Sequence, residues 1–198
     1  MSIIKSSVFV WQSALCVVAL AAAGVVGVAS PADANSRAFS ALAKGQAVAI
    51  VRHAKAPHPK GRKRVRGTKV VNLMSCASQR NLSAAGRRQA ARIGAALKRR
   101  GVRSARIISS AYCRTMDTAR LLNLGSVSWN YDLNALSKPT ARRQTAGFRS
   151  LLRNAPAGRA TIIVTHKTNI RALTGVTPAS GETLIVNRKG RVLARLRN

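Results

Sequence analysis

Apolar and polar residues follow two different spacings along the chain, and each spacing predicts one type of secondary structure. Short runs that are almost wholly apolar predict strands covered on both faces, because a strand with one wet face would alternate with polar residues. Such runs lie at residues 47–51, 106–109 and 161–165, with a weaker one at 126–129. Apolar residues that recur every three or four positions predict amphipathic helices. These helices are expected over residues 83–100, 114–122 and 141–152, with a short helix from 169 to 174.

The end of the chain predicts a hairpin. Residues 183–186 and 192–196 alternate in polarity around the turn sequence Asn-Arg-Lys-Gly at 187–190. Because strands alternate with helices before this hairpin, the expected fold class is α/β. We expect a three-layer sandwich in which helices flank a mostly parallel central sheet. Residues 35–45 are expected to be a short lead-in without an element, and residues 54–75 a polar loop.

The N-terminal segment has the pattern of a secretory signal. Lys5 precedes an apolar stretch from about residue 8 to 29, and residues 32–34 read Ala-Asp-Ala, an A-x-A cleavage signal. We therefore predict a signal peptide over residues 1–34 and one domain over 35–198, in the periplasm of a bacterium or outside the cell. The apolar stretch is also long enough for an uncleaved membrane anchor, which is the alternative.

The charge balance is strongly basic. The chain has 35 Lys and Arg residues against 4 Asp and Glu residues, a net charge of +31. The loop after residue 54 contains seven of these cations and no acid: Lys55, Lys60, Arg62, Lys63, Arg64, Arg66 and Lys69. Such a surface predicts non-specific binding of polyanions. The alternative is that the charge only serves solubility or life at low pH.

Histidine and arginine residues follow the predicted strands, at the edge of an α/β sheet where ligands bind. Arg52 and His53 end the first strand, Arg114 follows the second, and His166 follows the third. Arginine matches phosphate oxygens with two parallel hydrogen bonds, and a neutral histidine can attack phosphorus. Arg52 beside His53 also disfavours the imidazolium form. The pattern therefore indicates phosphoryl chemistry.

These motifs resemble those of the histidine phosphatase superfamily, which includes phosphoglycerate mutases, acid phosphatases and phytases. Residues 51–54, Val-Arg-His-Ala, resemble its Arg-His-Gly motif with Ala in place of Gly. Residues 81–90 resemble its first helix, residues 109–119 its second arginine motif, and residues 164–166 its second histidine. The signal, the cysteine pair and residues 169–182 are similar to a small exported bacterial branch.

The resemblance implies a role for each of these residues. His53 would be the nucleophile that forms a phosphohistidine, and Arg52, Arg114 and His166 would complete the phosphate pocket. Lys55 is a further candidate for substrate binding. Neither a metal nor a cofactor is expected, and the scattered histidines and cysteines lack the spacing of a zinc site. His58 matches no motif and is expected to be a loop residue.

The general acid is the point where this chain departs from the family. Relatives usually use a carboxyl group to protonate the leaving oxygen. In one branch it directly follows the second histidine, where this chain has Lys167. In the other branch it follows the second arginine motif, and Asp132 lies near that place. Glu182 is the alternative acid, a site without any acid is the third option, and Asp117 is expected to pair with nearby arginines.

Two cysteines lie beyond the predicted signal, Cys76 and Cys113. An even pair in an exported protein predicts a disulfide, which would hold Arg114 through the backbone of its neighbour. Two buried free thiols are the alternative.

The predicted function is a metal-independent phosphomonoester hydrolase acting through a phosphohistidine on His53. Its substrate would be strongly anionic, such as a phosphorylated small molecule or an envelope glycan. The alternative is a non-catalytic protein that binds phosphate or polyanions on a phosphatase scaffold. A mutase is a third option, but export would separate it from glycolytic intermediates.

Overall fold

The computed structural model describes residues 30–58, 72–73 and 75–197. Its core is a six-stranded sheet with the order β3-β2-β4-β1-β5-β6. The strands are β1 (Val48–Arg52), β2 (Ala105–Ser109), β3 (Val127–Trp129), β4 (Ala160–Thr165), β5 (Thr183–Val186) and β6 (Val192–Leu196). Strands β1 to β4 pair in parallel, while β5 pairs antiparallel with both β1 and β6. The predicted mostly parallel sheet and C-terminal hairpin are thus confirmed.

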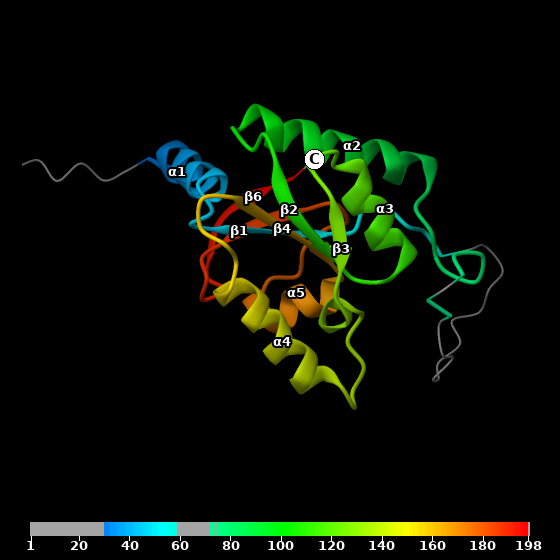
Figure 1. Ribbon diagram of the computed structural model, residues 1–198. Helices are drawn as coiled ribbons and strands as arrows, with labels where there is room; N and C mark the ends of the chain where they lie inside the picture. The colour runs from blue at the N-terminus through cyan, green and yellow to red at the C-terminus, as the bar shows by residue number, and fades with distance from the viewer. Residues whose placement is uncertain (1–29, 59–71, 74, 198) are drawn as a thin grey trace, which may run out of the picture.

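Helices cover both faces of this sheet (Figure 1). The helices are α1 (Pro31–Ala43), α2 (Ala84–Arg99), α3 (Cys113–Leu121), α4 (Ala141–Arg153) and α5 (Lys167–Thr174), with a 3-10 turn η1 (Tyr131–Leu133). Helices α1, α2 and α3 contribute to one hydrophobic cluster, and α4 and α5 to the other. The three-layer sandwich predicted from the sequence is therefore present.

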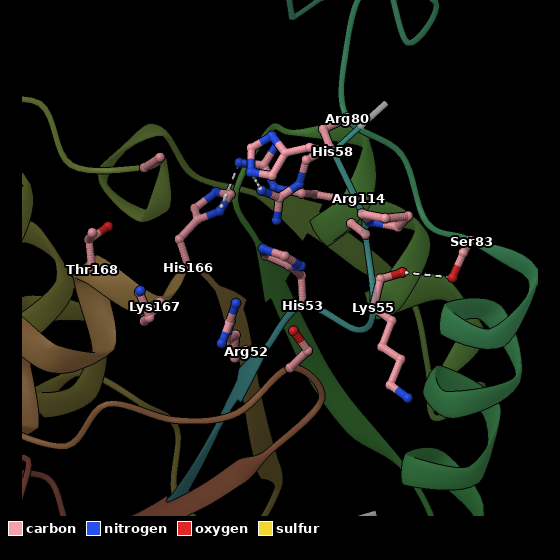
Figure 2. A pocket seen from close by; sticks show the side chains of 14 residues that line it. Arg52, His53, Lys55, His58, Arg80, Ser83, Arg114, His166, Lys167 and Thr168 are labelled. Carbon is pink, nitrogen blue, oxygen red and sulfur yellow. Dashed lines mark hydrogen bonds between the residues drawn. The ribbon is translucent and has the colours of Figure 1, made fainter. Parts of the chain in front are cut away.

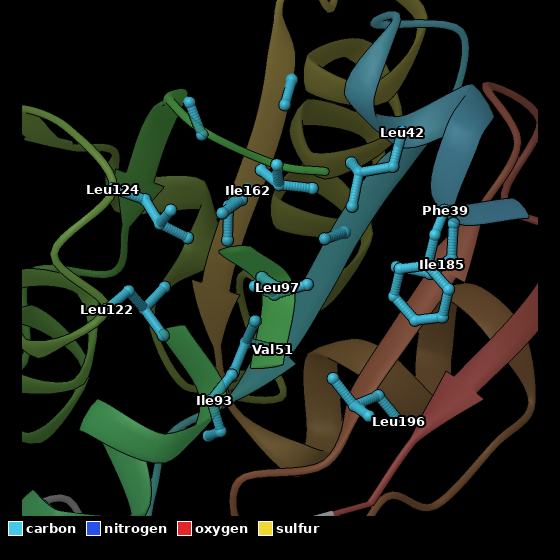
Figure 3. Packing of buried hydrophobic residues seen from close by; sticks show 14 of the residues in the cluster. Phe39, Leu42, Val51, Ile93, Leu97, Leu122, Leu124, Ile162, Ile185 and Leu196 are labelled. Atoms are coloured by element: carbon cyan, nitrogen blue, oxygen red, sulfur yellow. The ribbon is translucent and has the colours of Figure 1, made fainter. Parts of the chain in front are cut away.

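The apolar runs are explained by burial on both faces of the sheet. In β1, Ala49 and Val51 belong to the cluster beneath α1, α2 and α3, whereas Val48 and Ile50 belong to the cluster above α4 and α5. Figure 3 shows Val51 packed among residues of α2, including Ile93 and Leu97. The strand ends that carry the catalytic candidates therefore emerge from the buried core of the sheet.

The lead-in expected over residues 35–45 is wrong, because this segment belongs to helix α1. Phe39 and Leu42 are spaced to face the sheet together and are buried in the core. Ser30 caps the helix and forms a reciprocal capping box with Asp33. The predicted cleavage position after Ala34 falls in the first turn of this helix.

The predicted signal segment lies mostly outside the described residues, which begin at residue 30. The same is true of residues 59–71 in the basic loop. Within the described part of the chain, no helix is both long and apolar enough to cross a membrane.

Helix α2 packs closely against the chain that leaves β1. Ser83 caps α2 as predicted, and its hydroxyl accepts a hydrogen bond from the Gly86 amide. A side chain on Gly86 would clash with the backbone carbonyl of Lys55. Only glycine therefore lets the first turn of α2 support the segment directly after His53.

Candidate active site

The two strand-end histidines meet because their strands are neighbours. Strand β1 pairs with β4 so that Arg52 lies beside Thr165, and the next residues are His53 and His166. Their ring centroids are 5.5 Å apart. Arg114 reaches the same place from the first turn of α3, which follows β2 on the other side of β4 (Figure 2). The four residues predicted for the phosphate pocket are thus brought together by the sheet.

These residues open into a pocket of about 630 Å³. Its wall is formed by Arg52, His53, Lys55, Ala56, Pro57, His58, Arg80, Ser83, Arg114, Ala135, His166, Lys167, Thr168 and Ser180. Every ionisable side chain in this wall is a histidine, a lysine or an arginine. Such a pocket favours an anion.

His53 is held in the tautomer that a nucleophile requires. Its Nδ1 lies 2.9 Å from the carbonyl oxygen of Ala54, which can only accept a hydrogen bond. Nδ1 therefore carries the proton and Nε2 keeps its lone pair. Burial, together with the charges of Arg114, Arg80 and Arg52, lowers the pKa of His53 to about 3, against the raising effect of the Ala54 hydrogen bond. The ring is thus neutral at neutral pH.

His166 is held between an arginine and a serine. Arg114 Nη2 lies 3.1 Å from His166 Nδ1, and because guanidinium can only donate, Nδ1 accepts. The proton of the neutral ring is then on Nε2, which donates to Ser110 Oγ at 2.8 Å. Burial lowers the pKa of His166 well below its ordinary value, and the charge of Arg114 acts in the same direction. The Tyr112 ring packs against both His166 and the Arg114 guanidinium.

Arg52 and Arg114 keep donors for an anion. Arg52 Nη1 donates to the carbonyl oxygen of Pro178 at 2.8 Å, which orients the guanidinium. Within the described part of the chain, the Nε atoms of both arginines are buried without a hydrogen-bond partner. Burial lowers the pKa of Arg114 to about 10, so it still carries a charge at neutral pH. A buried donor without a partner is costly, and a bound phosphate oxygen would satisfy it.

Arg80 and His58 line the pocket, although neither residue was predicted to belong to the site. Arg80 Nη1 lies 2.8 Å from His58 Nε2, which accepts because guanidinium can only donate. The charge of Arg80 also lowers the pKa of both His53 and His166. The available signal for Arg80 was its position directly before the helix motif that begins at Asn81. No local pattern marks His58.

A disulfide joins the segment that carries Arg80 to the start of α3, as predicted. Cys76 and Cys113 are bonded, with their Cα atoms 5.8 Å apart. Gln79 Oε1 accepts from the Cys113 amide at 3.0 Å, and Asn81 Nδ2 donates to the Cys76 carbonyl at 2.7 Å. The segment is thereby tied to the helix that presents the other pocket arginine.

The two acid candidates do not line the pocket. The Asp132 carboxylate lies against Gly147 of α4, where no side chain competes for the space. Glu182 is buried, and its carboxylate accepts from the Ala179 amide and from Arg195 and Arg197. Both of its oxygens therefore have structural partners.

The other two carboxyl groups are also elsewhere. Asp117 pairs with Arg87 at 3.6 Å and with Arg120 at 3.9 Å, as expected, and Asp33 caps α1. All four acidic side chains of the chain lie in its described part, and none of them is in the pocket wall.

Lys55 contributes its backbone to the pocket more than its side chain. Its amide donates to Gln89 Oε1, and its carbonyl accepts from Ser83. Figure 2 shows the Lys55 side chain extending away from His53 and Arg114. In the described residues, no group of three or more His, Cys, Asp or Glu side chains is arranged to hold a metal ion.

A family model with the description "Histidine phosphatase superfamily (branch 1)" matches residues 48–133. This range begins at β1 and ends at η1, so it includes His53, Arg80 and Arg114. A search of curated protein sequences gives no match to the chain.

Solved structures share the fold. SixA from Agrobacterium tumefaciens superposes with a TM-score of 0.56 at 15% identity, covering 78% of this chain and 99% of that one. The protein histidine phosphatase SixA complexed with tungstate gives a TM-score of 0.53 at 16% identity, covering 76% and 96%. SixA from Nakamurella multipartitia gives the same four values. At identities this low, the superpositions establish a common fold and nothing about the reaction.

Proposed function

Because a model of the histidine phosphatase superfamily matches residues 48–133, we propose that the chain belongs to this superfamily and hydrolyses phosphomonoesters through a phosphohistidine formed on His53. The observation that carries this proposal is the state of the His53 ring. Its proton is held on Nδ1 by Ala54, its pKa is lowered to about 3, and its Nε2 lone pair remains for attack. A histidine with only a structural role would not require a neutral ring whose Nε2 lone pair is available beside three arginines.

The reaction proceeds in two steps. The lone pair of His53 Nε2 attacks phosphorus, the bond from phosphorus to the ester oxygen breaks, and the ester oxygen leaves with the bonding electrons and takes up a proton to become the alcohol. Water then attacks the phosphohistidine and gives up a proton, the bond from phosphorus to nitrogen breaks, and inorganic phosphate is released. Arg52 and Arg114 bind the equatorial oxygens, where the transition state spreads negative charge.

His166 supports phosphate binding through Arg114. With Nδ1 accepting from Arg114 and Nε2 donating to Ser110, its ring holds the Arg114 guanidinium in the pocket. In this tautomer Nδ1 has a lone pair and no proton, so a direct hydrogen bond from His166 to a phosphate oxygen requires the proton to move to Nδ1.

The substrate we propose is a strongly anionic phosphomonoester outside the cytoplasm, either a phosphorylated small molecule or an envelope glycan. The disulfide supports an oxidising compartment, where such bonds persist. The lysine and arginine side chains of the pocket wall, which contains no acidic residue, support a substrate with several negative charges. Expression of the chain fused to a reporter that is active only in the periplasm tests the location. Absence of reporter activity would contradict it.

Labelling of His53 tests the mechanism. The full chain is mixed with a radiolabelled aryl phosphate and quenched, and the label is tested for the loss in acid that characterises phosphohistidine. We expect wild type and the control Lys98→Gln, a change on the exposed face of α2, to be labelled and to turn over substrate. His53→Ala should lose both. Turnover by His53→Ala at the wild-type rate would overturn the mechanism.

A non-catalytic phosphate or polyanion binder is the second candidate. It is favoured by one observation, the absence of every carboxyl group of the chain from the pocket wall. The same experiment separates the two functions. A wild-type protein that binds inorganic phosphate, but is neither labelled nor active on an aryl phosphate, would support the binder.

A further inference from the structure

An alkyl phosphate cannot release its alcohol readily unless the leaving oxygen receives a proton. No carboxyl group of this chain lies in the pocket wall, although the chemistry proposed for His53 creates the need for one. We propose that His58 is the proton donor that takes the place of the missing carboxyl group. This inference rests on the proposed phosphatase activity and adds a catalytic residue to it.

The location of His58 fits this role. His53 is buried at the base of the pocket, whereas His58 is an exposed part of the same pocket wall. Figure 2 shows the His58 ring beside Arg80 and Arg114, with His53 across the pocket from it. In phosphoryl transfer the attacking atom and the leaving oxygen lie roughly in line on opposite sides of phosphorus. A phosphate attacked by His53 therefore presents its leaving oxygen toward the mouth, on the side where His58 lies.

The other two histidines are unsuited to donate this proton. His53 is the nucleophile, and its only proton is held by the Ala54 carbonyl. The proton of His166 is directed at Ser110, and burial keeps that ring neutral. Of the side chains in proteins, imidazole is the one whose charge changes most readily within the physiological pH range. Among the pocket histidines, His58 is the one that is open to solvent.

Arg80 couples the state of His58 to the arrival of phosphate. In the structure Arg80 donates to His58 Nε2, which holds that ring in its neutral form. Besides His58, the ionisable side chains of the pocket wall are all cationic or neutral: Arg52, His53, Lys55, Arg80, Arg114, His166 and Lys167. A bound phosphate dianion attracts the Arg80 guanidinium and offsets the surrounding positive charge. His58 Nε2 is then released from Arg80, and the imidazolium form becomes favourable only when substrate is present.

The proton of His58 moves to the leaving oxygen as the ester bond breaks. The His53 Nε2 lone pair forms the bond to phosphorus, and the electrons of the breaking ester bond move to the leaving oxygen. That oxygen takes the proton of the His58 imidazolium, so an alcohol leaves and His58 becomes neutral. Neutral His58 can accept a proton from the water that hydrolyses the phosphohistidine, which restores the imidazolium.

The dependence on the leaving group tests the proposal. The full chain and its variants are assayed for kcat/KM on p-nitrophenyl phosphate, whose leaving group needs no proton, and on glycerol phosphate, whose leaving group does. This ratio reports the steps up to loss of the leaving group, so it excludes the hydrolysis of the phosphohistidine. We expect His58→Gln to lower kcat/KM for the alkyl ester by about 100-fold or more. For the aryl ester we expect a change of less than about threefold, because no proton is required.

A role for His58 that is only structural has a different signature. If His58 merely orients Arg80 for phosphate binding, His58→Gln lowers kcat/KM equally for both esters, and the proposal is overturned. Equal activity of the variant and wild type on glycerol phosphate also overturns it, as does a wild type that hydrolyses only the aryl ester. Added imidazole should restore alkyl-ester turnover to His58→Gly and leave aryl-ester turnover unchanged.

Two further variants complete the comparison. Lys167→Met tests Lys167, which follows His166, as a competing proton donor. If kcat/KM for the alkyl ester falls selectively in Lys167→Met and not in His58→Gln, the proposal is overturned. Lys98→Gln, on the exposed face of α2, should leave both ratios unchanged. Loss of aryl-ester turnover in His53→Ala is the separate test of the phosphatase activity itself.

Discussion

At the scale of single residues, the pocket is organised by hydrogen bonds to groups that can only donate or only accept. A carbonyl can only accept and a guanidinium can only donate, so the partners of His53 and His166 determine which ring nitrogen carries the proton. Burial and the nearby arginines then keep both rings neutral. The His53 ring is therefore already in the state that the proposed nucleophilic attack requires.

The ionisation of the histidines can be measured directly. Burial lowers the pKa of His53 from 6.5 to about 3, so between these values the unfolded chain binds a proton that the folded chain does not. Folding stability from this group is therefore complete above pH 6.5 and decreases as the pH falls toward 3. We expect the imidazole NMR resonances of His53 and His166 to show no titration near pH 6.5, with His53→Ala used for assignment. A His53 midpoint near that pH would contradict the prediction.

Glu182 is expected to serve stability instead of catalysis. Burial by itself raises the pKa of Glu182, but the Ala179 amide and the Arg195 and Arg197 side chains outweigh it and hold the pKa below 4.5. Its contribution is therefore present above that pH and is lost as the pH falls through the lower folded value. We expect Glu182→Gln to reduce the free energy of unfolding by about 1–3 kcal/mol at pH 7, measured in urea. At pH 3 the difference from wild type should shrink, and a constant difference would refute the ionic explanation.

At the scale of elements, the site depends on how neighbouring segments are joined. The disulfide and the Gln79 side chain link the segment of Arg80 to α3, and the Ala54 amide donates to Thr118 of α3 at 3.0 Å. Helix α3 thus supports both the residue after His53 and the segment that carries the third pocket arginine. Secondary structure alone would leave these loops free to move apart.

Removal of the disulfide tests this link. The bond joins cysteines that are 37 positions apart, and the entropy model predicts about 4 kcal/mol of stabilisation for a loop of this size. We expect Cys76→Ser to lower the melting temperature and, at temperatures where it is folded, to raise KM because Arg80 is less well placed. Reduction of wild type should reproduce both effects and leave the variant unaffected. An unchanged KM would show that the segment is held without the bond.

Helix α1 is expected to contribute to the core through a single buried face. Leu42 is fully buried, and we expect Leu42→Ala to reduce the free energy of unfolding by about 2–5 kcal/mol. A chain that begins at Asn35 loses the Ser30 cap but keeps Leu42, and should lose only about 1 kcal/mol. Thermal denaturation of both proteins shows which of them loses more stability. A larger loss in the shortened chain would place the stabilisation in the first turn.

At the scale of the whole molecule, net charge is the dominant property. With a charge of +31, the protein attracts anions over a range that salt limits to about 8 Å at physiological strength. For the proposed reaction, we expect this attraction to act on the encounter with substrate and hardly at all on a phosphate already bound by Arg52 and Arg114. The global charge and the pocket charge therefore affect different kinetic constants.

Changes in salt concentration and substitutions in the basic loop separate the effect of the net charge from that of the pocket charge. We expect kcat/KM for a substrate with several phosphates to fall as salt rises, while kcat stays nearly constant. The basic loop from Lys55 to Lys69 lies largely outside the described residues, and its role stays a prediction. Joint neutralisation of Arg62, Lys63, Arg64 and Arg66 should flatten the salt dependence of kcat/KM. An unchanged dependence would assign the effect to the rest of the surface.

The sequence by itself determined the elements and the ends of the strands. The order of apolar runs and periodic segments is a local property, so it predicted the α/β sandwich, the C-terminal hairpin and helix α2 from Ser83 onward. Since parallel strands end at one edge of a sheet, it also predicted that His53 and His166 lie together. The even cysteine count predicted the disulfide.

Tertiary structure decided what surrounds these strand ends. The placement of Asp132 against α4 and of Glu182 among Arg195 and Arg197 depends on contacts between distant segments, which no local pattern encodes. The same is true of Arg80 and His58, which are 22 positions apart on the connection from β1 to α2. Helix α1 was missed because its cap, Ser30, stands before the predicted cleavage site. Spacing along a chain orders residues within one element, whereas the chemistry of a pocket follows from distances that packing alone sets.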